Sequence, residues 1–137
     1  MNQHTYLRAY LAGIAVPTVT LLGVMGGYIL LRYVYNLPVP VERIIVFPMA
    51  VVPNLWGLWN ILFFASRSRL RLSLGLHGAL LPFLLAPLGL LVAGLLNFSV
   101  PDIAAHALPV LAPVALIVYY LAWKYLVGAL NRILELA

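Results

Sequence analysis

The sequence has no cysteine and very little charge. Of its 137 residues, 8% are charged and 65% are hydrophobic. The absence of cysteine excludes disulfides, thiolate metal sites and thiol catalysis. Soluble domains are about 25% charged and about 45–50% apolar, and disordered chains are poor in apolar residues. The composition therefore excludes both classes and predicts an integral, multi-pass membrane protein.

The few charges divide the chain into uncharged runs at 9–31, 44–66, 72–101 and 103–123. Each run is long enough to cross a bilayer as a helix, which takes roughly 20 apolar residues. A membrane β-barrel would instead show alternating segments of about ten residues, whereas 79–96 reads ALLPFLLAPLGLLVAGLL. We therefore predict an all-α fold. It is a single four-transmembrane-helix bundle over residues 1–137, with spans at about 8–31, 43–65, 73–97 and 103–127.

The eight basic residues are unequally divided between the two sides of this bundle. Six lie on the side of the termini, and only Arg32 and Arg43 lie on the other. Since Lys and Arg concentrate in cytoplasmic loops, we predict an N-in/C-in orientation in a bacterial-type inner (plasma) membrane. Three of the six, Arg67, Arg69 and Arg71, form one short loop that is expected to contact anionic lipid headgroups. This distribution explains the net charge of +5 without nucleic acid as a partner.

Small residues recur at helical spacing along the first span. They are Ala9, Gly13, Val16, Thr20, Gly23 and Gly27. Small residues allow close approach of helix backbones in lipid. The pattern is equally compatible with packing inside one chain and with a seam between subunits, so we carry a homo-oligomer and an accessory or assembly subunit as hypotheses.

Polar and aromatic residues near the middle and outer half of the bundle define a candidate ligand or permeation site: Asn54, Trp56, Trp59, Asn60, Asp102 and His106. The alternative for Asn54 and Asn60 is interhelical hydrogen bonding, which an amide in lipid requires. The alternative for Asp102 and His106 is a local hydrogen bond at the outer interface. No third ligand stands next to this pair in the sequence, so no metal site is predicted.

Acids and enzyme motifs are missing from the predicted spans. Glu42, Asp102 and Glu135 all lie outside the uncharged runs. Proton-coupled exporters need an acid within the membrane, so the small four-span multidrug exporters, which carry one in the first span, are disfavoured. The chain has no G-x-S-x-G, H-E-x-x-H or phosphate-binding loop. We predict no catalytic residue and no cofactor.

The leading functional hypothesis rests on the positions of the prolines. Pro48 and Pro53 lie in the outer half of the second span, and Pro109 and Pro113 lie in the outer half of the fourth. Proline frees backbone carbonyls, and broken helices often mark binding sites in transporters. We therefore favour a non-enzymatic pore or carrier for a small or lipophilic solute, working as a homo-oligomer. The alternatives are the accessory subunit and a membrane enzyme acting on lipid through the arginine loop.

Overall fold

The computed structural model describes residues 3–39, 41–97 and 102–136, and every regular element in these ranges is a helix. Four helical stretches are long and apolar enough to cross a membrane: His4–Tyr33, Val41–Leu70, Leu74–Leu95 and Pro109–Ile133. The all-helical fold and the four candidate spans confirm the coarse prediction from composition. The last stretch continues to Ile133 rather than ending near 127, because apolar residues resume after Lys124.

The stretches are built from shorter elements joined end to end. They are α1 (Gln3–Tyr33), α2 (Val41–Ile44), η1 (Ile45–Met49), α3 (Ala50–Leu70), α4 (Leu74–Ala79), α5 (Leu81–Leu95), α6 (Asp102–Leu121), η2 (Ala122–Val127) and α7 (Gly128–Ile133). The η elements are π-helical turns. The first of them contains Pro48, which removes a backbone donor, whereas η2 contains no proline.

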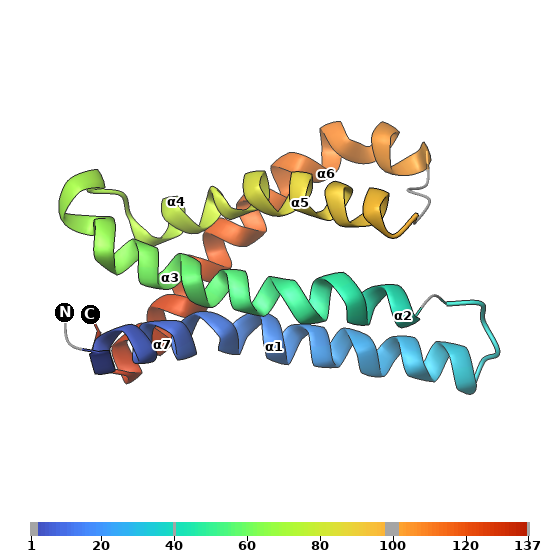
Figure 1. The fold of residues 1–137 in the computed structure, drawn as a ribbon, viewed down its shortest axis with the longest axis horizontal. Coiled ribbons are helices and arrows are strands. Elements are labelled where there is room, and N and C mark those ends of the chain that lie inside the picture. The colour runs from blue at the N-terminus through green and yellow to red at the C-terminus, as the bar shows by residue number, and fades with distance from the viewer. Residues whose placement is uncertain (1–2, 40, 98–101, 137) are drawn as a thin grey trace.

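Both termini lie at one end of the molecule, beside the turn between α3 and α4 (Figure 1). An ion pair of 3.5 Å between Arg8 Nη1 and Glu135 Oε2 joins the two chain ends. At the opposite end, Arg32 Nη1 and Glu42 Oε1 lie 2.6 Å apart across the connection between α1 and α2. The arginine loop and both termini therefore share one end of the fold, as the division of charge predicts.

The closest helix pair is α1 and α3, which run side by side (Figure 1). A Cβ atom added to Gly13 would lie 2.6 Å from the Trp56 carbonyl oxygen and 2.7 Å from Gly57 Cα. A Cβ atom added to Gly57 would lie 2.5 Å from the Tyr10 ring. These two glycines permit the close backbone approach, in agreement with the role of small residues in membrane helix packing.

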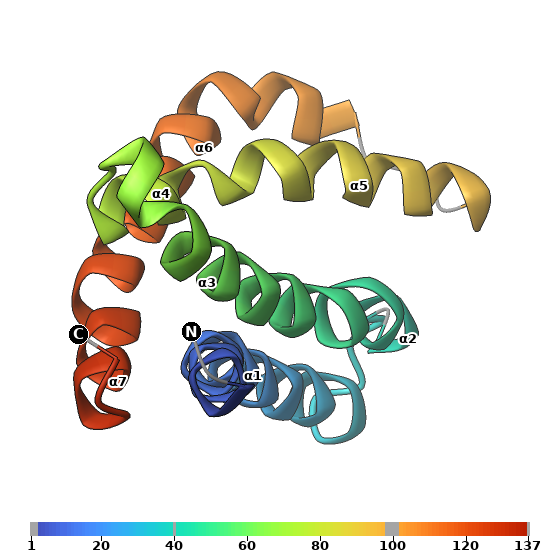
Figure 2. The same cartoon turned by 60° about the vertical axis from the view of Figure 1, so that its left-hand side comes forward.

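The second half of the chain diverges from this pair. After α4, helix α5 leads away from α3, and α6 lies beside α5 (Figure 2). The buried core lies where α3, the start of α5 and η2 meet, with Trp56, Leu81, Leu85, Trp123 and Val127 packed together. The chain reverses direction between α3 and α4, but these two helices do not form the closest antiparallel pair. That pair is α1 with α3, because Gly13 and Gly57 face each other between them.

Candidate functional site

Two buried amides connect three helices near the end that carries the termini. Asn60 Nδ2 donates to Asn131 Oδ1 at 2.8 Å, and Asn131 Nδ2 donates back to Asn60 Oδ1 at 3.2 Å. Asn60 Nδ2 also donates to the Ala9 carbonyl at 2.8 Å. Both amides are fully buried, at 0% and 1% exposure. Asn60 therefore holds α1, α3 and α7 together. This is the interhelical hydrogen bonding that the sequence offered as the alternative to a permeation role. Sequence reasoning missed Asn131, because it lies beyond the predicted end of the last span.

A second polar cluster joins α3 to α4. Trp59 Nε1 donates to the His77 carbonyl at 2.8 Å, and His77 Nε2 lies 3.0 Å from the Trp59 carbonyl. Since a carbonyl only accepts, the imidazole carries its proton on Nε2 in this bond. The two rings stack with their centroids 4.9 Å apart. The indole N–H of Trp59 is therefore engaged in internal packing.

The structure does not bring Asn54 and His106 into the lining of one pocket. Asn54 accepts a hydrogen bond from the Tyr10 hydroxyl and donates to the Ala50 carbonyl at 2.8 Å. It lines a pocket of about 220 Å³ on α1 and α3, and His106 is not among the lining residues. His106 is an exposed residue of α6. Asp102 begins α6, but its side chain lies outside the described residues, so the proposed Asp102–His106 contact does too.

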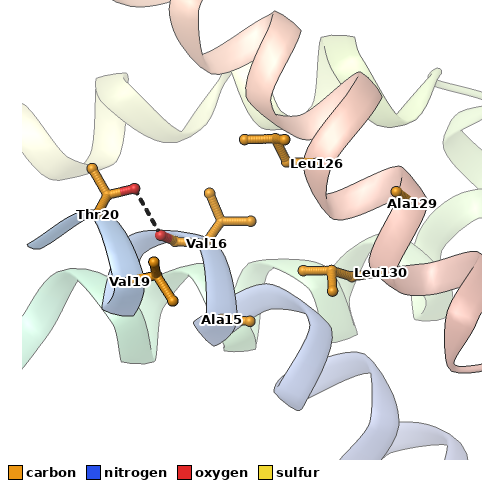
Figure 3. A pocket seen from close by; sticks show the side chains of 7 residues that line it. All are labelled: Ala15, Val16, Val19, Thr20, Leu126, Ala129 and Leu130. Atoms are coloured by element: carbon orange, nitrogen blue, oxygen red, sulfur yellow. Dashed lines mark hydrogen bonds between the residues drawn. The ribbon is translucent and has the colours of Figure 1, made fainter. Parts of the chain in front are cut away.

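The first and last helices line an apolar groove. One part, of about 380 Å³, is lined by Ala15, Val16, Val19, Thr20, Leu126, Ala129 and Leu130 (Figure 3). An adjoining part, of about 300 Å³, shares Val16, Thr20 and Leu126 with it and adds Pro17, Leu21, Val52, Trp56, Val118, Tyr119 and Ala122. The Thr20 hydroxyl donates to the Val16 carbonyl at 2.9 Å, so its proton is used within α1 (Figure 3).

Trp56 lines the second part of the groove and packs into the buried core. The residue is 5% exposed, and its indole Nε1 has no hydrogen-bond acceptor among the described residues. The Tyr119 ring lies 5.2 Å from the Trp56 ring, centroid to centroid. The indole Nε1 of Trp123, which is fully buried in the core, has no acceptor among the described residues either. The unpaired indole N–H groups therefore belong to the aromatic core as a whole.

The π-helix η2 forms one wall of the groove. Ala122 and Leu126 of this turn line it, whereas Trp123 and Val127 of the same turn enter the core. Single π-helical turns inside α-helices occur frequently at functional sites. No proline lies in η2, so this π-helical turn could not be predicted from the sequence.

The small residues of α1 do not form one continuous packing face within the chain. Ala9 and Gly13 are buried, while Val16 and Thr20 line the groove. Gly23 and Gly27 are exposed, and a Cβ atom added to either would meet nothing within 4 Å. The first part of the pattern therefore serves internal packing, and the second part faces outward.

The predicted arginine loop is only partly a loop, because α3 continues past the expected end at 65 to Leu70 and contains Arg67 and Arg69. Arg67, Arg69 and Arg71 are all exposed, and Arg71 ends α3 with φ of 48°. Within the described ranges, no three His, Asp or Glu side chains lie close enough together to hold a metal ion. Comparison with protein-family models, curated proteins and solved structures finds no match for this chain.

Proposed function

We propose that this protein is a non-enzymatic membrane carrier that binds a lipophilic solute in the groove between α1 and the last helix. The groove itself carries the proposal. Its two parts, of about 380 and 300 Å³, share three lining residues and match the size of ordinary ligand sites, roughly 300–1,000 Å³. Its lining is apolar apart from Thr20, Tyr119 and Trp56.

A carrier fits these observations better than an aqueous pore. A water-filled path needs polar groups that are free to contact water. The buried polar side chains Asn60, Asn131 and His77 are instead hydrogen-bonded to one another or to the backbone. Four long apolar helices are compatible with a small multi-pass membrane protein. We further propose that the end bearing the arginine loop faces the cytoplasm and anionic headgroups.

The test compares two phenylalanine variants of the protein in liposomes. Ala129→Phe places a ring in the groove, because Ala129 lines it. Ala65→Phe is the matched control, because Ala65 is exposed on α3 and lines neither part of the groove. The probe is a nitroxide-labelled lipophile that quenches tryptophan fluorescence, and its protein-dependent transfer across the bilayer is measured alongside.

We expect saturable quenching and transfer for the wild type and for Ala65→Phe, with both reduced in Ala129→Phe. Circular dichroism checks that both variants keep their helix content. Quenching that rises in proportion to probe concentration, with no saturation and no effect of Ala129→Phe, would overturn the proposal.

The outward part of the small-residue pattern favours a second candidate, an assembly subunit. Among the described residues, nothing lies within 4 Å of a Cβ atom added to Gly23 or Gly27, and exposed large apolar residues such as Val19 and Leu22 lie on the same helix. A second copy of the chain would use these glycines for close backbone approach. Gly23→Leu should then abolish self-association measured by native mass spectrometry, and survival of the oligomer would exclude this interface.

A further inference from the structure

The last membrane-length helix changes character at the boundary between η2 and α7. Up to this boundary it is held by apolar packing, since Trp123 and Val127 of η2 belong to the buried core. Of the six residues of α7, all of them described, only Gly128 and Asn131 are buried, and Ile133 is 73% exposed. A segment with few buried apolar contacts opens more readily than the core. Apolar packing therefore fixes the position of α7 only weakly.

Polar contacts hold α7 in place instead. Asn131 exchanges two hydrogen bonds with Asn60, which also donates to the Ala9 carbonyl of α1. Just beyond α7, Glu135 Oε2 lies 3.5 Å from Arg8 Nη1 in an exposed ion pair, a kind of contact that contributes little stability. We call these contacts the clamp. Asn131 lies two residues from the end of the candidate span, where water is available to replace its partners.

The helix is also interrupted where its apolar packing ends. π-Helical turns bend α-helices and occur frequently at functional sites, and η2 forms without a proline. Gly128 follows at once, and a Cβ atom added to it would make only ordinary contacts, at 3.5 Å with Leu74 Cδ2 and 3.6 Å with the Trp123 oxygen. Packing thus does not require a glycine there, and glycine weakens a helix relative to alanine. The boundary has the features of a hinge.

The segment beyond this hinge forms one wall of the groove. Ala129 and Leu130 of α7 line its first part, opposite Ala15 and Val16 of α1 (Figure 3). Helix α6, by contrast, lies beside α5 (Figure 2). We propose, building on the proposed carrier function, that α7 is a gate. When the clamp releases, α7 rotates about η2 and Gly128 and opens the groove toward the end of the molecule that carries the termini.

The opposite wall of the groove is too tightly packed to be the moving part. Helix α1 contacts the backbone of α3 directly, because a Cβ atom added to Gly13 would lie 2.6 Å from the Trp56 carbonyl oxygen. Carriers expose a fixed site to the two sides in turn by moving one part of the bundle against the rest. In this chain, α1 and α3 form the fixed part and α7 is the part free to move.

The first test measures the position of α7 with spin labels on the full chain in nanodiscs. The sequence has no cysteine, so two introduced cysteines are the only thiols. Leu22→Cys with Ile133→Cys reports on α7 against α1, and Leu22→Cys with Leu62→Cys is the matched control for α3 against α1. All three positions are exposed. Leu22 lies 13 residues along α1 from Ala9, about 20 Å at 1.5 Å per residue, a separation that double electron–electron resonance measures.

We expect two distances for the Leu22–Ile133 pair and one narrow distance for the Leu22–Leu62 pair. Asn131→Ala should raise the ratio of open to closed α7 by roughly 5–30-fold, as one or two net hydrogen bonds predict. Gly128→Ala should lower the same ratio by up to roughly fivefold, because alanine favours the continuous helix. The narrow distance of the control pair in each variant shows that the rest of the fold is intact.

The second test locks the clamp. Arg8→Cys and Glu135→Cys are joined by a short crosslinker that a reducing agent cleaves, since the two native side chains meet at 3.5 Å. The locked protein should still show saturable tryptophan quenching by the nitroxide-labelled lipophile, but it should no longer transfer the lipophile across the bilayer. Reduction should restore transfer, which excludes misfolding of the double variant as the cause of the loss.

The outcomes separate the gate from the carrier function. A single Leu22–Ile133 distance that Asn131→Ala leaves unchanged would overturn the gate, and the groove would remain a binding site. Transfer by the locked protein at the rate of the reduced protein would overturn the gate as well. If the lipophile neither binds saturably nor is transferred while two distances are present, the carrier function fails, and the gating role fails with it although α7 moves. If Asn131→Ala does not fold, the locked protein decides the matter.

Discussion

Close approach of α1 and α3 at Gly13 predicts a large difference between two glycine-to-alanine variants of the same helix. Gly13→Ala adds a methyl group that would lie 2.6 Å from the Trp56 carbonyl oxygen and 2.7 Å from Gly57 Cα. Both of these are backbone atoms, so no side chain can move aside. Gly23→Ala adds the same group where nothing lies within 4 Å.

The magnitude follows from the separation that the methyl group requires. Moving the Trp56 oxygen from 2.6 Å to an ordinary contact of 3.4 Å takes about 0.8 Å of helix displacement. A gap of that size loses about a quarter to a half of the dispersion attraction at the contacts it opens, and overpacking costs about 1–3 kcal/mol. Both variants gain the same helix propensity, about 1 kcal/mol in alanine's favour. Gly13→Ala should therefore be about 1–3 kcal/mol less stable than Gly23→Ala.

The assay is reversible unfolding in mixed micelles with increasing SDS fraction, followed by circular dichroism and tryptophan fluorescence. Gly57→Ala adds a useful intermediate, because its new methyl group meets side-chain atoms of Tyr10 and Ile14 that can shift. We expect stability to fall in the order Gly23→Ala, Gly57→Ala, Gly13→Ala. Free energies of unfolding for Gly13→Ala and Gly23→Ala that agree within about 0.5 kcal/mol, the usual effect of a surface change, would refute the reasoning.

Three further predictions concern the polar contacts. Asn60→Leu and Asn131→Leu should each destabilise the fold by about 1–3 kcal/mol, because each leaves the other amide unpaired. In a double-mutant cycle, the double variant should lose less unfolding free energy than the two single variants added together. Strict additivity would contradict the pairing. Glu42→Gln, which removes the exposed ion pair with Arg32, should change stability by at most about 1 kcal/mol, and an effect of several kcal/mol would show that the pair is more than a surface contact. Replacing Arg67, Arg69 and Arg71 with glutamine should weaken the binding free energy of anionic lipid by about 1 kcal/mol for each charge removed near the surface. Native mass spectrometry would show this as lower lipid retention, and unchanged retention would place headgroup binding elsewhere.

The helices were predictable because composition alone determines them. Long uncharged runs favour membrane-length helices, and the ends of the first two helices near Arg32 and Arg43 agree with the charges to within a few residues. The second helix does not stop at 65 as predicted, because it continues through Arg67 and Arg69 to Leu70. The end of the last helix was placed too early, since Lys124 interrupts a sequence that returns to apolar residues and continues as helix to Ile133.

The candidate site was only partly predictable. Trp56 was predicted to belong to a ligand or permeation site, but the groove depends on Leu126 and Ala129, which are more than 60 residues away in the sequence. Periodicity within one helix carries no information about which helix packs against it. The same limitation applies to Asn60, whose partner Asn131 is 71 positions away. Prolines indicated η1 but gave no indication of η2.

Mapping where a lipophilic probe attaches to the protein tests the central claim most directly. A long-chain alkyl probe bearing a photoreactive diazirine is crosslinked to the protein in nanodiscs, with and without excess unlabelled probe, and the modified peptides are identified by mass spectrometry. We expect labelling at Val16–Thr20 and Leu126–Leu130, the two walls of the groove, that excess unlabelled probe reduces. Labelling that resists competition and spreads over exposed positions such as Phe83 and Leu95, with the groove unmodified, would contradict it.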